Sequence, residues 1–188
     1  MKRSTLLSAA LVAACCAVSC MKQALKTTYD KQSTFIESFV KAKMDADSTA
    51  TLTRTGEAYR VTLHDTLDRV LHRTDSLDWN GQVALYYACF TLTSANITAS
   101  NLVATNLKQM ADAAGWELSD TTRYKLDTLT LDKTLPEGLR NGLYGVQPYD
   151  EAFVLFTGEY GFGDSERGTI PARSALVYQI WIASIDND

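Results

Sequence analysis

Hydrophobic periodicity divides the chain into a helical N-terminal part and a strand-rich remainder. Between residues 22 and 46 the apolar positions recur at steps of three and four, which predicts an amphipathic helix. We expect this helix to pack on a folded domain or to act as a spacer, and a dimerisation arm is the alternative. Residues 45–55 are rich in Asp, Ser and Thr, which predicts a linker. The apolar helix positions are Leu25, Tyr29, Phe35, Ile36, Phe39, Val40 and Met44.

After residue 55 the apolar positions follow a period of two. Tyr59, Val61 and Leu63 alternate with polar residues, as in a strand with two different sides, whereas residues 83–92 are apolar enough to be a buried strand. Further strands are predicted at residues 126–131, 152–156 and 175–185. The polar segment 65–80 has leucines at positions 67, 71 and 77 and fits either a loop or a short helix.

Two short helices are predicted among these strands. Residues 101–114 show helical apolar spacing, and Gly115 would end that helix as its C-cap. Pro136 suits the first turn of a helix over residues 137–144, because its fixed φ and missing N–H cost nothing there. Many strands with few, scattered helices predict an α+β fold built on an antiparallel sheet.

Composition and charge narrow the function classes. The chain has 188 residues, of which 46% are hydrophobic and 21% charged, as in one globular domain. Its 18 Lys and Arg against 22 Asp and Glu give a net charge of −4 without a basic stripe, so no nucleic-acid partner is expected. His64, His72 and four cysteines form no HExxH or paired CxxC motif, so neither a metal site nor a cofactor is expected.

The first twenty residues have the features of an export signal. A cationic start precedes residues 5–19, an apolar run too short to span a membrane. The run ends in Ala17-Val18-Ser19-Cys20, which resembles the lipobox of bacterial lipoproteins, where a small residue precedes an acylated cysteine. Cys20 would then anchor the protein by lipid in the bacterial cell envelope, on the periplasmic side or the outer-membrane surface. Cys15 is the second choice, and an ordinary signal peptide ending in cysteine is the alternative.

This interpretation divides the chain into a signal peptide (residues 1–19), an N-terminal helix and linker (20–55) and a folded domain (56–188). Cleavage would remove Lys2 and Arg3 but no acidic residue, so the net charge would change from −4 to −6. Cys89 would be the only free thiol, and no intramolecular disulfide could form.

The C-terminal part resembles FKBP-type peptidyl-prolyl isomerases. In order, it has the strand from Ala152, an acidic-aromatic-glycine turn ending at Gly163, the pair Ile170-Pro171, and a final strand over residues 174–185. Upstream, three shorter pieces resemble the family's Val-x-Val-x-Tyr strand, its Phe-Asp-Ser/Thr-Asn segment and its Gly-Trp-x-x-Gly-Leu helix. Together the resemblance covers residues 56–186. The upstream pieces are Val83-x-Leu85-x-Tyr87, Val103-Ala104-Thr105-Asn106 and Gly138-Leu139-x-x-Gly142-Leu143.

The resemblance implies an FKBP-like curved antiparallel β-sheet around a short helix, preceded here by the N-terminal amphipathic helix. It also implies an apolar pocket for proline, with proline-containing peptides or exported proteins as partners. Rotation about a peptide bond must overcome about 18–20 kcal/mol, because amide resonance is lost. A dry apolar cleft favours the twisted amide by desolvating it, so no nucleophile is required.

Carried over position by position, the resemblance implies eight substrate-binding residues. They form the wall, the floor, the flap side and the backbone donor to the substrate carbonyl. Tyr87 and Val103 would form the wall, Ala104 would stand at the family's Asp position, and the N–H of Leu135 would be the donor. Leu139 would be the floor, Phe162 would stand where a Tyr offers its hydroxyl to the ligand, and Ile170 and Tyr178 would close the flap side.

Four of these positions depart from the family. Ala104 stands where the family has Asp, Val103 where it has Phe, Leu139 where it has Trp, and Phe162 where it has Tyr. The segment 101–114 is also longer than the minimal family loop and is expected to cover or reshape the cleft. Two functions therefore stay open: an envelope prolyl isomerase that assists folding of exported proteins, or a catalytically degenerate binding, chaperone or surface-interaction module.

The first prediction concerns the anchor. Replacing Cys20→Ser should release the protein from the membrane fraction, because the acylated thiol would be lost. Membrane fractionation and metabolic lipid labelling measure this, with Cys15→Ser as the matched control that should stay anchored. Unchanged fractionation and labelling of the Cys20→Ser protein would refute the assignment.

Overall fold

The computed structural model describes residues 2–63, 76–117 and 121–188, with side chains from residue 21 onward. Helix α1 (Lys2–Ala46) ends where the helix pattern predicted. The chain forms two compact units, residues 1–31 and 32–188, so the last turns of α1 belong to the same unit as the sheet. His64, His72, most of the segment 65–80 and the side chains of Cys15 and Cys20 lie outside the described part.

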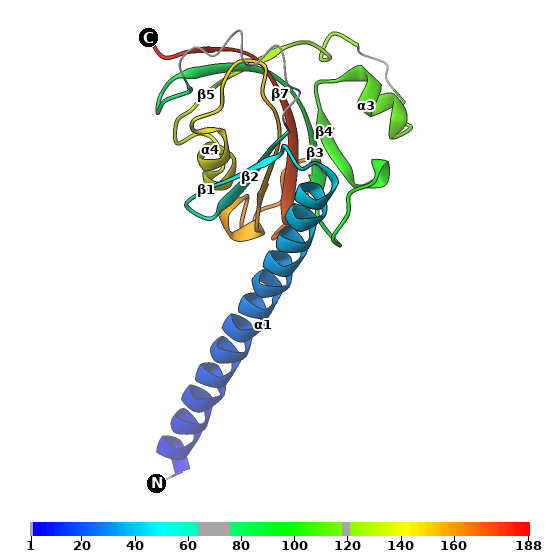
Figure 1. Cartoon of the computed structure of the whole chain (residues 1–188). Coiled ribbons are helices and arrows are strands. Elements are labelled where there is room, and N and C mark those ends of the chain that lie inside the picture. Colours follow the sequence, from blue (N-terminus) through cyan, green and yellow to red (C-terminus); the bar gives the residue numbers. More distant parts are fainter. Residues whose placement is uncertain (1, 64–75, 118–120) are drawn as a thin grey trace. The chain divides into compact units, whose positions relative to one another are not determined.

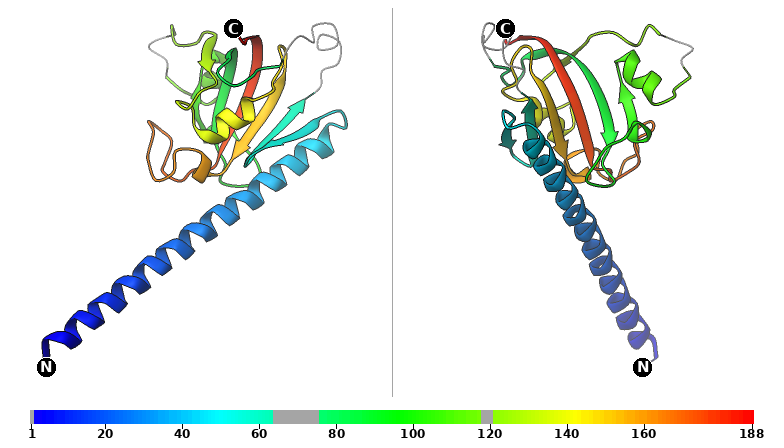
Figure 2. Two further views of the ribbon diagram at one scale, coloured as in Figure 1. Left: turned by 90° about the vertical axis from the view of Figure 1, so that its left-hand side faces the viewer. Right: turned by 45° about the vertical axis from the view of Figure 1, so that its right-hand side comes forward.

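A single antiparallel sheet forms the body of the second unit. Its strand order is β1-β2-β6-β7-β3-β4, and β5 pairs with β3 beside this path. The sheet curves, with the short helix α4 (Glu137–Leu143) lying against it (Figures 1 and 2), which confirms the predicted fold class. The strands are β1 (Thr51–Thr55), β2 (Ala58–Leu63), β3 (Gln82–Thr91), β4 (Leu102–Thr105), β5 (Asp127–Thr130), β6 (Glu151–Phe156) and β7 (Leu176–Asp186).

The central strands are buried on both faces. One set of their side chains packs with Leu139 and Leu143 of α4, and we call this the α4 cluster. The alternate set packs with Ile36, Phe39 and Val40 of α1, and we call this the α1 cluster. Burial on both faces explains why residues 83–92 and 175–185 are nearly continuous apolar runs. The α4 cluster takes Val83, Leu85, Val154, Phe156, Tyr178 and Ile180, and the α1 cluster takes Ala88, Phe90, Phe153, Leu155 and Val177.

Two glycines let α4 lie directly on β6. A Cβ added at Gly138 would come within 2.2 Å of the Phe156 side chain, and one added at Gly142 would come within 2.0 Å of Val154. Pro136 precedes the helix as its N-cap residue. The spacing Gly138-x-x-x-Gly142 therefore marks the helix face that contacts the sheet, and the predicted helix over residues 137–144 is confirmed to within one residue.

Arg60 of β2 is buried, although the apolar positions 59, 61 and 63 predicted that the residues between them lie on a polar side of the strand. The residue is 8% exposed. Its Nη1 donates to the carbonyl oxygens of Gly142, at 3.0 Å, and Tyr144, at 2.6 Å, which lie at the C-terminal end of α4. The last carbonyls of a helix have no partner within the helix, so Arg60 caps α4 from the sheet.

Two local predictions were wrong. Thr51–Thr55, expected as part of a linker, forms β1 and pairs with β2. Of the predicted helix over residues 101–114, Leu102–Thr105 forms β4 on the edge of β3, and only Lys108–Ala113 forms helix α3. The edge of β3 offers backbone N–H and C=O groups with which residues 102–105 pair. The spacing of apolar residues along the sequence does not reveal such a distant partner. Gly115 follows α3 with a φ of +70°, so the predicted helix end is confirmed.

The contact between α4 and β6 generates the second prediction. Gly142→Ala should lower the free energy of unfolding by about 1–3 kcal/mol, because the new methyl group overpacks Val154. Alanine would otherwise favour the helix by about 1 kcal/mol. Urea denaturation measures the change, and Asn141→Ala, one position earlier in α4, is the matched control. A Gly142→Ala protein as stable as the parent would contradict this account of the helix contact.

Candidate functional site

The structure brings all eight predicted site residues to one place, the α4 cluster. Three of them are buried within the cluster, and we call these three the floor; the other five are half-buried and pack against the cluster. The floor is Leu139, Ile170 and Tyr178, and the half-buried side chains are Tyr87, Val103, Ala104, Leu135 and Phe162. We call these eight residues the apolar site. They come from β3, β4, α4, β7 and the loops beside them, so only the tertiary structure assembles the site.

Aromatic contacts hold the floor in place. The ring centroid of Tyr178 lies 6.1 Å from that of Tyr87, at an interplanar angle of 44°. The Tyr178 ring also stacks on that of Phe156, with 6.0 Å between the ring centroids and an interplanar angle of 21°. Phe156 also contacts α4 next to Gly138, as described above. The position of Tyr178 therefore depends on the same packing that holds α4 on the sheet.

The ionisable groups of the site are neutral at physiological pH. Burial raises the pKa of the Cys89 thiol to about 12, although a hydrogen bond from Tyr178 acts in the opposite direction. Burial, followed by the proximity of Cys89, raises the pKa of Tyr178 well above its usual value. Burial is also the main reason why the pKa of Tyr87 is raised. The floor therefore carries no charge, as a site that desolvates an amide requires.

Thr105 and Asn106 hold β3 at the site. The Asn106 side chain, 5% exposed, accepts a hydrogen bond from the Tyr87 N–H at 2.7 Å and donates to the Leu85 carbonyl at 3.0 Å. The Thr105 hydroxyl donates to the Tyr87 carbonyl at 2.6 Å. These bonds fix the backbone that carries Tyr87. The sequence predicted no role for the Asn106 side chain, although Asn106 ends the family-like segment Val103-Ala104-Thr105-Asn106.

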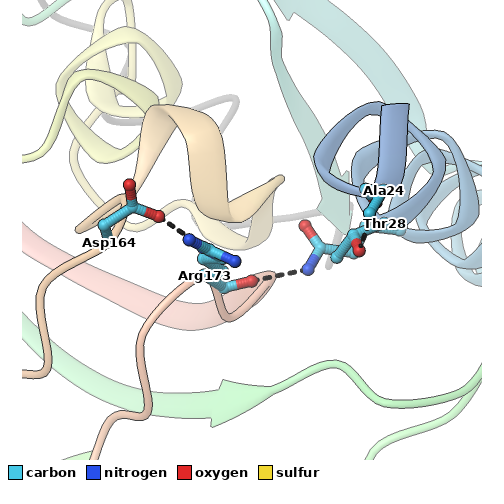
Figure 3. A network of polar contacts seen from close by, with 5 residues as sticks. Ala24, Thr28, Asp164 and Arg173 are labelled. Carbon is cyan, nitrogen blue, oxygen red and sulfur yellow. Dashed lines mark hydrogen bonds and ion pairs between the residues drawn. The ribbon is translucent and has the colours of Figure 1, made fainter. Parts of the chain in front are cut away.

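The segment 158–173, which we call the flap, carries Phe162 and Ile170. The Thr169 hydroxyl donates to the Val103 carbonyl at 2.7 Å, which joins the flap to β4. The Arg173 N–H donates to the Gly163 carbonyl at 2.6 Å. The Arg173 side chain forms an ion pair with Asp164 (Figure 3). Contacts within the flap and across to β4 therefore position both apolar side chains.

Gln32 ties both ends of the flap to α1. Its Oε1 accepts a hydrogen bond from the Gly158 N–H at 2.9 Å, and its Nε2 donates to the Arg173 carbonyl at 2.6 Å. A Cβ added at Gly158 would lie 2.4 Å from the Arg173 backbone, so this closure requires glycine. No local pattern in the sequence indicated Gln32, because its partners are more than 120 residues away.

The site offers apolar surface and neutral hydrogen-bond donors. The backbone N–H of Leu135 donates to no acceptor among the described residues. An apolar surface with a free N–H donor can desolvate a proline ring and bind a carbonyl oxygen, and no nucleophile is needed for this.

Two other kinds of feature are absent from the described residues. No group of three or more His, Cys, Asp or Glu could hold a metal ion there. The same residues contain no helix long and apolar enough to cross a membrane.

The buried thiol generates the third prediction. A thiol reagent should label Cys89 only after unfolding, as peptide mapping would show. Above the ordinary thiol pKa of 9.0 the unfolded chain loses this proton while the folded chain keeps it until about pH 12. The free energy of unfolding should therefore fall over that interval, by up to about 1.4 kcal/mol per pH unit for this group.

Cys89→Ala is the control, because its free energy of unfolding should fall less steeply above pH 9. The decline that remains in this variant would come from groups such as Tyr178, whose pKa is also raised. Rapid labelling of the native protein, or an identical pH slope in the variant, would show that the thiol is not protected in this way.

Solved structures share this fold at low sequence identity. The three FKBP domains of wheat FKBP73 align with a TM-score of 0.55 and 14% identity over 74% of this chain, which spans about half (52%) of that chain. FkpA from Escherichia coli aligns with a TM-score of 0.54 and 12% identity, over 96% of this chain and 71% of the FkpA chain. A peptidyl-prolyl cis-trans isomerase from Pseudomonas syringae pv. tomato aligns with a TM-score of 0.55 and 12% identity, over 86% of this chain and 96% of the isomerase chain. No family model and no curated protein matches the chain. The likeness shows that the fold is FKBP-like.

Proposed function

We propose that this protein binds proline-containing polypeptides at the apolar site and catalyses their cis-trans isomerisation only weakly. The observation that carries the proposal is the convergence of the eight residues on one uncharged cluster, with five of them half-buried over a buried floor. A partly exposed apolar surface of this kind favours transfer of a proline ring out of water. Leu135 packs against the same cluster, and in this proposal its backbone N–H donates to the carbonyl next to the proline.

Weak turnover follows from three of the substitutions. Ala104 and Phe162 lack the carboxylate and the hydroxyl that the resemblance places there, so two polar partners of the twisted amide are missing. Leu139 is 4% exposed and packs between α4 and the sheet, where it presents a smaller surface than an indole. Contacts that act mainly in the transition state affect rate more than affinity. Peptide binding should therefore survive better than catalysis.

The cellular setting belongs to the same proposal. The lipobox-like stretch ending at Cys20 supports a lipid anchor in the bacterial envelope, and exported polypeptides are then the accessible substrates. The N-terminal signal is the support for this location. The Cys20→Ser fractionation described above tests it separately from peptide binding.

The fourth prediction tests the site. Phe162→Ala should weaken binding of a Leu-Pro peptide about tenfold, since a half-buried aromatic contact would be lost. Titration calorimetry measures the affinity, and a Leu-Ala peptide shows how much of it depends on proline. Tyr59→Ala removes a half-buried aromatic side chain packed on the α1 cluster and is the matched control. Equal affinity of the two variants, or of the two peptides for the parent, would overturn the proposed binding site.

Restoring the family residues tests the rate. Leu139→Trp, Ala104→Asp and Phe162→Tyr together should raise isomerisation more than peptide affinity. Exchange NMR on the Leu-Pro peptide measures the rate without a coupled protease. Because Leu139 is buried, the double variant Ala104→Asp, Phe162→Tyr provides a version that leaves the floor intact. A parent protein as fast as a typical FKBP, or folded variants with unchanged rates, would show that these substitutions do not limit turnover.

A further inference from the structure

A pocket lies on the face of the sheet opposite the apolar site. Its volume is about 310 Å³, and α1, β3, β6 and β7 line it together with side chains from residues 97–113. It shares no residue with the apolar site, because alternate residues of the same strands point to opposite faces. Thus Phe153 lines this pocket, whereas its neighbour Val154 belongs to the α4 cluster. The main side chains of the lining are Lys43, Phe90, Ile97, Leu102, Met110 and Phe153.

The lining is apolar except for a few groups, of which Lys43 alone is charged. Its Nζ lies 4.4 Å from the ring centroid of Phe153 and 5.3 Å from that of Phe39. These rings hold the half-buried ammonium at the pocket without neutralising its charge. Among the described residues no carboxylate forms an ion pair with Lys43, although Lys41, two positions earlier, pairs with Asp45.

We propose that this pocket binds a medium-chain aliphatic carboxylate, with its chain among the apolar side chains and its carboxylate on Lys43. The volume lies at the lower end of the range for small-molecule sites, roughly 300–1,000 Å³. The charge selects the ligand class, because an anion gains a charge-assisted hydrogen bond from an ammonium that has no carboxylate partner there. Met110 is flexible and adapts to an aliphatic chain. The proposal does not depend on prolyl-peptide binding.

Titration calorimetry of the full chain with decanoate, below its micelle concentration, tests the proposal. Decanoate should bind saturably, and 1-decanol about tenfold more weakly, because the alcohol lacks the charge. Lys43→Gln should lower the affinity for decanoate about tenfold and leave the affinity for decanol unchanged. Lys41→Gln is the matched control, since Lys41 lies on the same helix but does not line the pocket, and it should bind as the parent does.

A second variant tests the location. Ala113→Trp places a large ring at an exposed lining position of α3. It should lower the affinities for both decanoate and decanol while the protein stays folded. Absence of saturable decanoate binding, equal binding of decanol, or equal affinities of the two lysine variants would overturn the proposal. Competition by the Leu-Pro peptide would overturn it too, because it would identify a peptide site instead. Loss of peptide binding at the apolar site would leave these results unchanged.

Discussion

The close approach of α4 to β6 is the contact on which most of this structure depends. It requires residues without a Cβ at Gly138 and Gly142, because any side chain there would enter the space of Phe156 or Val154. Once α4 lies flat on the sheet, Leu139 enters the floor of the apolar site. The C-terminal carbonyls of the helix then reach Arg60 on β2. Packing and capping thus support the same placement of one seven-residue helix.

The apolar site is therefore a part of the core that stays partly exposed. Its floor is held by stacked aromatic rings, and burial keeps Cys89 and Tyr178 protonated. The walls are held by polar groups instead, since Asn106 fixes the strand at Tyr87 and Gln32 fixes the ends of the flap. Apolar packing supplies the binding surface, and buried hydrogen bonds with specific geometry determine where its edges lie.

The two faces of the sheet differ in chemistry although the same strands build both. The face toward α4 is uncharged and suits a neutral, ring-shaped group. The face toward α1 holds a pocket lined by Lys43, which has no ion-pair partner in the described part of the chain. Because side chains alternate along a strand, substitutions on one face can change one surface without touching the other. This separation is the physical basis for testing the two proposals independently.

The sequence alone determined the elements whose signals are local: the buried strand at residues 83–92 and the helix after Pro136. The family resemblance also selected eight residues that the fold brings together. Only the tertiary structure decided that Leu102–Thr105 pairs as β4, that Arg60 is buried, and that Gln32 and Asn106 serve the site. The reason is that periodicity reports which face of an element is apolar, whereas these outcomes depend on which backbone groups elsewhere in the chain lack a partner.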